Sequence, residues 1–290
     1  MRVRTFILYG LYFFTACLAC AVILFPGEQV ARRLSTALSL QLPLQKVDIA
    51  DTALSFPPGL ALNDIRITLG NGRSIAQDHL TLVPVYGSLL KPVKLIRFTA
   101  NILQGEVSGR LAYDSGSGTL QFVESLEWRE VQIRNLAYTN TLSDLKLSFD
   151  TSGRYDHQSS ENKGAGQIDF SGLNIQSRHA LFEELDTPVL AFAMARVDYT
   201  WNPGTLLIDK LLAKGPVMTL KLDGDVKPRG RFGSSPLDDA DIRLKGMVQP
   251  TPAYVSKFAA IPALVMRFKE NRLNGIPIEI YGTLGRPGIK

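Results

Sequence analysis

The residues that could do chemistry are few and widely spaced. Cys17 and Cys20 form a C-x-x-C spacing, which is typical of redox motifs when the thiols are accessible. They lie inside an uncharged apolar run, where a thiolate is strongly disfavoured, so we interpret them as two small side chains one helical turn apart. His79, His157 and His179 are far apart and have no partner at i+4, so we expect solvated or capping roles for them.

Patterns for nucleophilic or phosphate chemistry do not occur in the sequence. Ser115 and Ser117 belong to a Gly-Ser turn, not to a G-x-S-x-G elbow. The segment Gly70-Asn71-Gly72 lacks the third glycine of a dinucleotide loop. The acidic clusters lack further metal ligands and are interpreted as solvated turns; they are Glu183-Glu184, Asp238-Asp239 and Asp241. We therefore expect no enzyme activity, no cofactor and no metal.

The basic residues do not form a nucleic-acid site. Lys and Arg number 32 against 27 Asp and Glu, a net charge of +5, which is a mild excess over 290 residues. The densest stretch is KPRGRFG, with Lys227, Arg229 and Arg231, and no helix or aromatic strand motif accompanies it. We expect a solvated loop; contact with anionic lipid headgroups or an acidic partner is the alternative.

The chain starts with a candidate membrane segment. Thr5 to Phe25 carries no charge and, at about 1.5 Å per residue, is long enough to cross a hydrocarbon core of about 30 Å. A cleaved signal peptide and a lipoprotein lipobox fit less well, because Val22 to Phe25 still follow the candidate sites. We expect residues 1–4 in the cytoplasm, 5–25 as a transmembrane anchor in a bacterial inner membrane, and the bulk in the periplasm.

Hydrophobic periodicity changes after the anchor. Residues 26–42 are predicted to form a short helical connector, because Val30, Leu34 and Leu38 share one helical face. From 43 to 290 the apolar residues mostly alternate with polar ones, as at Ile96, Phe98, Ala100 and Ile102, which predicts a β domain. Without a βαβ rhythm the sheet is expected to be antiparallel, with one apolar and one polar face.

Several connections are predicted from local sequence. Asp114 to Gly118 is expected to be a turn, Gly105-Glu106 a turn or a bulge, and Tyr155 to Gly166 an exposed loop. Short helices are expected around 181–185 and over 251–274, the latter with a kink or break at Pro262. The apolar face can be hidden by barrel closure, by a second sheet or by curling around an apolar ligand, and the periodicity leaves all three open.

Several segments together resemble the protein N family of the type II secretion system. They are the N-terminal anchor and short helix, SFPPGLALNDI at 55–65, LTLVP at 80–84 with SLL at 88–90, GEVSGRL at 105–111, and IPIEIYGTLGRPGI at 276–289. The resemblance spans nearly the whole chain. It implies a non-enzymatic accessory or assembly component that contacts other secretion subunits, and it supplies no catalytic residues.

The same segments also resemble segments of AsmA-like proteins. That resemblance implies a curved antiparallel sheet, a trough or sandwich with one or two short helices, that handles lipid. It also implies structural roles for Pro57, Gly59, Gly105 and Gly109 at approaches and bends of strands. In this alternative, phospholipid is a partner and the apolar face lines a groove; the expected lining residues are Phe98, Ile102, Leu147, Phe149 and Phe170.

Overall fold

The computed structural model describes residues 24–41, 46–68, 74–117, 119–140, 143–177, 189–229, 239–255, 275–283 and 286–289, together with 9, 12, 13, 16 and 20. The fold is mainly β. Its helical elements are α2 (Gly27–Gln41) and the 3-10 turns η1 (Tyr86–Ser88) and η3 (Pro252–Tyr254). The strands are β1 (Lys46–Ser55), β2 (Gly59–Thr68), β3 (Ser74–Pro84), β4 (Val93–Ile102), β5 (Gly105–Asp114), β6 (Thr119–Asn140), β7 (Ser143–Gln158), β8 (Lys163–Ser177), β9 (Val189–Asn202), β10 (Thr205–Lys214), β11 (Met218–Lys227), β12 (Asp241–Pro250), β13 (Ile276–Thr283) and β14 (Arg286–Ile289).

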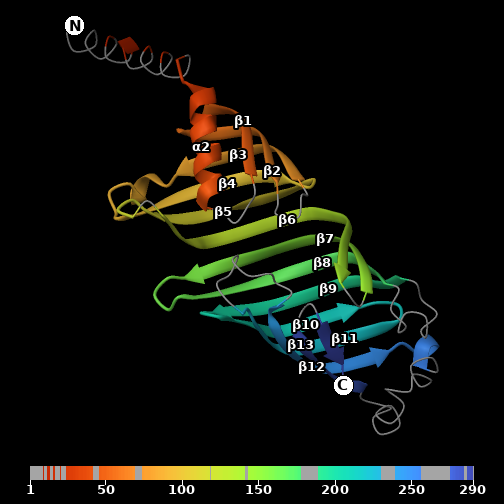
Figure 1. The fold of residues 1–290 in the computed structure, drawn as a ribbon. Helices are drawn as coiled ribbons and strands as arrows, with labels where there is room; N and C mark the ends of the chain where they lie inside the picture. Colours follow the sequence, from red (N-terminus) through yellow and green to blue (C-terminus); the bar gives the residue numbers. More distant parts are fainter. Residues whose placement is uncertain are drawn as a thin grey trace. The chain divides into compact units, whose positions relative to one another are not determined.

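The strands form a large antiparallel sheet in chain order, β1 through β14 (Figure 1). This confirms the predicted mainly β, antiparallel class. The chain divides into two compact units, which are described separately. Unit 1 comprises Met1–Ile102 and Leu111–Gln121, and unit 2 comprises Leu103–Arg110 and Phe122–Lys290.

The predicted anchor at 5–25 lies almost entirely outside the described residues. Among the residues that the structure does describe, no helix is long and apolar enough to span a bilayer. The helix α2 begins at Gly27, directly after Pro26, and covers most of the stretch for which a helical connector is predicted. Its sequence lacks strong interior helix breakers, and Glu28 and Arg32 face each other at i and i+4.

Unit 1 has its core between α2 and the first strands. Ala31 of α2 and Leu62 of β2 are each 1% exposed, and Leu34 packs against the same cluster. The edge of β1 is also tied to the helix, because the Ile49 amide donates to Ser35 Oγ at 3.1 Å. The helix therefore covers apolar residues of β1 to β3 and satisfies an amide of the edge strand.

A local break in the pairing keeps the apolar side chains of unit 1 on one face. Ile49 pairs with Ile65 and Asp51 pairs with Asn63, so the register is unchanged and Ala50 and Asp64, which face each other across the step, are not paired. Asp64 takes a positive φ of 49°. Without this irregularity, Leu62 and Ile65, three residues apart on β2, would point to opposite faces of the sheet, yet both are buried in one core.

Unit 2 has a second core, built on β9 to β13. Its buried members are Phe192, Ala195, Ala213, Val217, Met218, Val248 and Ile276. Val248 of β12 lies opposite Ile276 of β13. Phe192 and Ala195 are three positions apart on β9, across a step where Gly172 of β8 has a φ of 60° and is not paired. Strict alternation therefore accounts for only part of this core.

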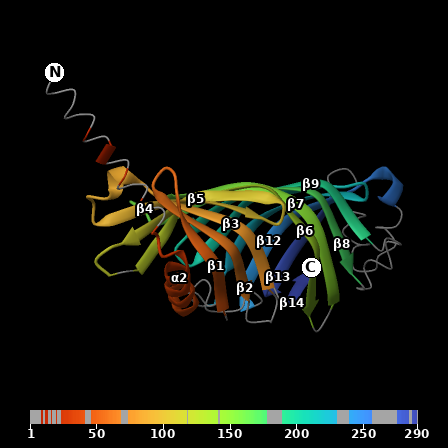
Figure 2. The same cartoon turned by 90° about the horizontal axis from the view of Figure 1, so that it is seen from above.

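Strand β6 carries two bulges that were not predicted. Glu130 and Asn135 both have φ of 52°, and the pairing with β7 shifts at each of them. Ser152 Oγ accepts the Glu130 amide at 2.9 Å, and Ser148 Oγ accepts the Asn135 amide at 3.0 Å. The two serines thereby satisfy amides that the bulges remove from the ladder, and β6 bends along its length (Figure 2).

Two predicted connections are wrong. The stretch Tyr155 to Gly166 is not a loop, because β7 runs to Gln158 and β8 starts at Lys163, leaving a short turn. The many polar residues of this stretch mask the alternation of Tyr155 and His157, whose ladder partners on β8 are Gly166 and Gly164. Likewise Gly105 begins β5, and the tight turn consists of Leu103 and Gln104, both with positive φ.

The other expected turns and helices are described only in part. Asp114 Oδ1 accepts the Gly116 amide at 2.9 Å, which confirms the turn after β5. The helix expected from Thr251 is described only as η3, and Thr251 donates its hydroxyl to the Pro216 carbonyl at 2.7 Å without capping the turn. Residues 256–274 and the helix expected at 181–185 lie outside the described residues.

Candidate functional site

The unit-2 apolar face is the side of β6 to β13 that carries the second core. Around that core its large side chains are only half-buried, and they include Leu147, Phe149, Phe170, Leu173, Ile175, Leu190, Leu211, Leu220 and Ile278. Phe149 of β7 and Phe170 of β8 meet edge to face, with ring centroids 5.2 Å apart. Large apolar groups that keep accessible surface next to each other are unusual for a closed core.

The opposite face of unit 2 is charged. Arg196 Nε of β9 donates to Asp169 Oδ1 of β8 at 2.6 Å, and Gln167 Nε2 donates to Asp169 Oδ2 at 2.6 Å. Asp169 pairs directly with Arg196 in the ladder. Adjacent positions of the same strands therefore contribute either apolar or ionic groups, which separates the two faces chemically.

Three aromatic rings each lie over a glycine of the adjacent strand. A Cβ on Gly166 would lie 2.5 Å from the Tyr199 hydroxyl oxygen, and a Cβ on Gly164 would overlap the Tyr155 ring. A Cβ on Gly153 would likewise overlap the ring of its partner Trp128. We call Trp128, Tyr155, Tyr199 and these glycines the aromatic–glycine strip; the missing side chains let each ring lie flat on the sheet.

The polar atoms of the strip are engaged within it. Trp128 Nε1 donates to Thr151 Oγ1 at 3.2 Å, and Tyr155 Oη is hydrogen-bonded to His157 Nδ1 at 3.1 Å. Burial raises the pKa of Tyr199 to about 12, with smaller contributions from Tyr155 and Asp156. Burial also raises the pKa of Tyr155. Both phenols are therefore neutral at physiological pH, and the strip is amphipathic without being ionic.

The structure brings together three of the five expected lining residues. Leu147, Phe149 and Phe170 lie on the unit-2 apolar face. Phe98 and Ile102 belong to β4 of unit 1, where Phe98 pairs with Leu82, a residue packed against the core under α2.

The expected structural residues lie at strand starts and close approaches. Pro57 follows Phe56 through a cis peptide bond in the β1–β2 turn. Gly59 and Gly105 begin β2 and β5, and a Cβ on Gly105 would lie 2.5 Å from the Arg129 carbonyl oxygen. Gly109 is a half-buried position within β5.

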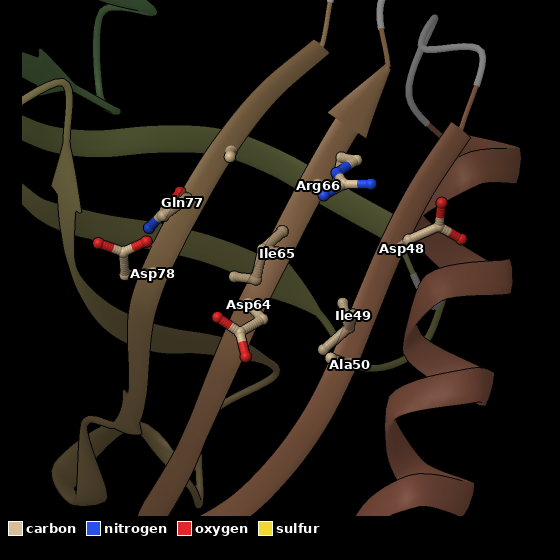
Figure 3. A pocket seen from close by; sticks show the side chains of 9 residues that line it. Asp48, Ile49, Ala50, Asp64, Ile65, Arg66, Gln77 and Asp78 are labelled. Carbon is tan, nitrogen blue, oxygen red and sulfur yellow. The ribbon is translucent and has the colours of Figure 1, made fainter.

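A polar depression of about 320 Å³ lies over β1 to β3 in unit 1 (Figure 3). It coincides with the unpaired step at Ala50 and Asp64, and Asp48, Asp64 and Asp78 line it. Lys46 Nζ is 2.8 Å from Asp48 Oδ2, so one of these charges is already neutralised. Within the described ranges, no group of three or more His, Cys, Asp or Glu side chains could hold a metal ion.

The cations of the basic stretch are paired where they are described. Arg229 donates to both carboxylate oxygens of Asp241, at 3.0 and 2.6 Å, and this hydrogen bonding lowers the pKa of Asp241. Lys227 Nζ lies 3.3 Å from Asp225 Oδ2. Arg231 lies outside the described residues. Lys227 and Arg229 are therefore less available to an external anion than their sequence spacing suggests.

Sequence reasoning missed the aromatic–glycine strip. The signal was present in the alternation of Gly164 and Gly166 on the strand between Tyr155 and Tyr199. Comparison of the chain with protein-family models, with curated proteins and with solved structures gives no match.

Proposed function

We propose that this chain is a non-enzymatic lipid-binding protein that holds acyl chains on the unit-2 apolar face. The observation that carries the proposal is the half-buried Phe149–Phe170 pair, set among other half-buried apolar residues on one side of the sheet. Acyl chains need apolar contacts and no hydrogen-bond partners, and the half-buried apolar side chains around the second core would supply such contacts.

The aromatic–glycine strip supports an amphipathic ligand rather than a purely apolar one. Tyr155 and Tyr199 combine apolar rings with neutral hydroxyl groups, and Trp128 adds an indole. Such side chains favour the boundary between hydrocarbon and polar groups. In the proposal, the aromatic–glycine strip contacts the ester or headgroup region of the bound lipid, and the acyl chain of that lipid lies along Phe149 and Phe170.

The proposed setting is the bacterial inner membrane. The uncharged run from Thr5 to Phe25 is the anchor, with the N-terminus in the cytoplasm and the sheet in the periplasm. The helix α2 follows this run after Pro26 and packs onto unit 1. A lipid-binding face on an anchored protein acts where its ligand is locally abundant.

Accessory function in the type II secretion system is the second candidate. It is supported by the segments at 55–65, 80–84, 88–90, 105–111 and 276–289 that resemble protein N. A specific feature also favours it: among the described strands, the four-residue β14 ends the sheet order and pairs with β13, so a strand of a secretion subunit would add at its other edge. Neighbouring secretin and pseudopilin genes would support this role, and neighbouring phospholipid-transport genes would support lipid handling alone.

Native mass spectrometry with lipid extraction tests the proposed binding. The full chain is purified in detergent beside two matched variants, Phe170→Asp and Ser171→Asp. Phe170 lies on the apolar face, whereas Ser171 is exposed on the next position of β8. We expect phospholipid on the wild-type chain and on Ser171→Asp, and its loss from a folded Phe170→Asp. Equal lipid on both variants, or none on the wild type, would overturn the proposal.

A further inference from the structure

Large apolar side chains are exposed at one end of unit 1. Phe56, in the β1–β2 turn, is 96% exposed, and Leu90, in the β3–β4 connection, is 99% exposed. Leu89 and Tyr86 of the same connection are 46% and 49% exposed. We call these four residues the loop tip. Almost complete exposure of both a Phe and a Leu is costly in water, and it marks a contact surface.

The loop tip is held by specific hydrogen bonds. Tyr86 Oη donates to the Pro58 carbonyl at 2.8 Å, which joins the two connections. Ser88 is 3% exposed, and its hydroxyl donates to the Val85 carbonyl at 2.7 Å while accepting the Leu95 amide at 2.8 Å. The apolar side chains are therefore presented outward by a structured base.

The loop tip lies at the end of unit 1 where the chain enters from the proposed anchor. A Cβ on Gly27 would overlap the Thr52 carbonyl oxygen, whereas Ser35, two turns later, bonds the Ile49 amide. The helix α2 therefore runs antiparallel to β1. Its start lies toward the end of β1 that turns at Phe56.

The two connections that carry the loop tip are positively charged, and Asp114 lies in the neighbouring turn, where Ser115 Oγ donates to the Pro92 carbonyl at 3.0 Å. The stretch 85–94 contains Lys91 and Lys94 and no carboxylate, and the turn FPPG at 56–59 has no charge. Lys94 Nζ donates to the carbonyls of Leu89 and Lys91, so its charge lies at the base of the exposed leucines. An anionic membrane surface attracts lysines that lie close to it.

We propose that the loop tip inserts into the interface of an anionic phospholipid bilayer, as a second membrane contact beside the anchor. Phe56, Leu89 and Leu90 enter the boundary of the acyl region, and Tyr86 lies at headgroup level. Lys91 and Lys94 then contact lipid phosphates. The position of the bilayer in this inference rests on the proposed anchor at 5–25. Lipid binding by unit 2 is not needed for it.

Depth-dependent quenching of a fluorescent probe tests the proposal. The full chain, with Cys17→Ser and Cys20→Ser, receives a single cysteine by Phe56→Cys, Leu90→Cys or Lys46→Cys. Each is labelled with an environment-sensitive probe and reconstituted into vesicles of phosphatidylglycerol and phosphatidylethanolamine, with or without lipids that carry a quencher on the acyl chain. Phe56 and Leu90 are almost fully exposed, so these changes leave the core intact. Lys46 is the control because it starts β1, at the strand end away from Phe56.

We expect blue-shifted emission and strong quenching at positions 56 and 90, and neither at 46. Flotation followed by alkaline extraction reports the anchor separately. If the probes at 56 and 90 are quenched and the chain resists alkaline extraction, both membrane contacts are supported. If the probes are quenched but the chain is extracted, the loop tip is supported and the anchor is overturned. A chain that resists extraction but gives no more quenching at 56 and 90 than at 46 overturns the loop tip alone. A chain that does not float with the vesicles overturns both.

Discussion

At the scale of single residues, burial of Tyr199 in the aromatic–glycine strip makes the stability of the fold depend on pH. Burial raises its pKa from 10.0 to about 12 in the folded chain. The folded state therefore holds this proton more tightly than the unfolded state. The resulting stability is fully present below pH 10 and is lost as the pH rises through about 12.

We predict that Tyr199→Phe weakens the alkaline loss of stability. The variant lacks the phenol, so its unfolding midpoint in urea should fall less than that of the wild type between pH 10 and 12. Tyr281→Phe is the control, because Tyr281 is 43% exposed. Identical pH profiles for Tyr199→Phe and the wild type would show that the Tyr199 phenol is not buried in solution.

Gly166 tests the packing of the same ring. Alanine at this position would place a methyl group against the Tyr199 hydroxyl and a backbone carbonyl, so we predict a loss of about 1–3 kcal/mol in the free energy of unfolding. Gly87→Ala is the matched control, since a Cβ there meets nothing within 4 Å. Denaturant titration should separate the two variants. Equal stabilities would contradict the ring-over-glycine arrangement.

At the scale of elements, the β6 bulges depend on two serines of β7. Ser148→Ala and Ser152→Ala each remove the acceptor of a bulge amide, so each should cost about 1 kcal/mol of unfolding free energy. Ser160→Ala, in the β7–β8 turn, is the control and should be neutral. Thermal unfolding of the three variants tests this. Neutral behaviour of both bulge variants would mean that water serves the amides equally well.

The β4–β5 turn carries strain that a substitution can relieve. Leu103 and Gln104 have φ of 50° and 65°, the conformation in which Asn-Gly is preferred. Combining Leu103→Asn with Gln104→Gly should therefore raise the free energy of unfolding by about 1 kcal/mol. A lower denaturant midpoint in the double variant would contradict the turn type.

The elements show where sequence reasoning succeeds and where it fails. The spacing of Val30 and Leu34 correctly indicates a helix, and alternation around Phe98 correctly indicates a strand. The bulge at Glu130 was not predicted because glutamate carries no turn signal. Asparagine does tolerate positive φ, but a single asparagine at 135 within an apolar-alternating segment is too weak a signal to predict a bulge. Hydrogen bonds to Ser152 and Ser148 of β7 support both positions. The β7–β8 hairpin was mistaken for a loop because glycines and polar residues dominate its sequence.

At the scale of the whole molecule, alternation predicts the antiparallel sheet and its two chemically different faces. It also places Leu147, Phe149 and Phe170 together, because side-chain direction follows from strand parity. The alternation of side-chain direction along a strand does not reveal which strands belong to the same compact unit. For that reason Phe98 and Ile102 could be assigned to an apolar face but not to a unit from the sequence.

Crosslinking with a photoactivatable phospholipid can locate acyl chains on the unit-2 apolar face. The full chain is reconstituted with a lipid that carries a diazirine on its acyl chain, irradiated and digested. We predict adducts on Phe149, Phe170 and their neighbours on that face, and none on Asp169 or Arg196 of the charged face. Adducts confined to residues 5–25, which report lipid around an anchor, would contradict this prediction.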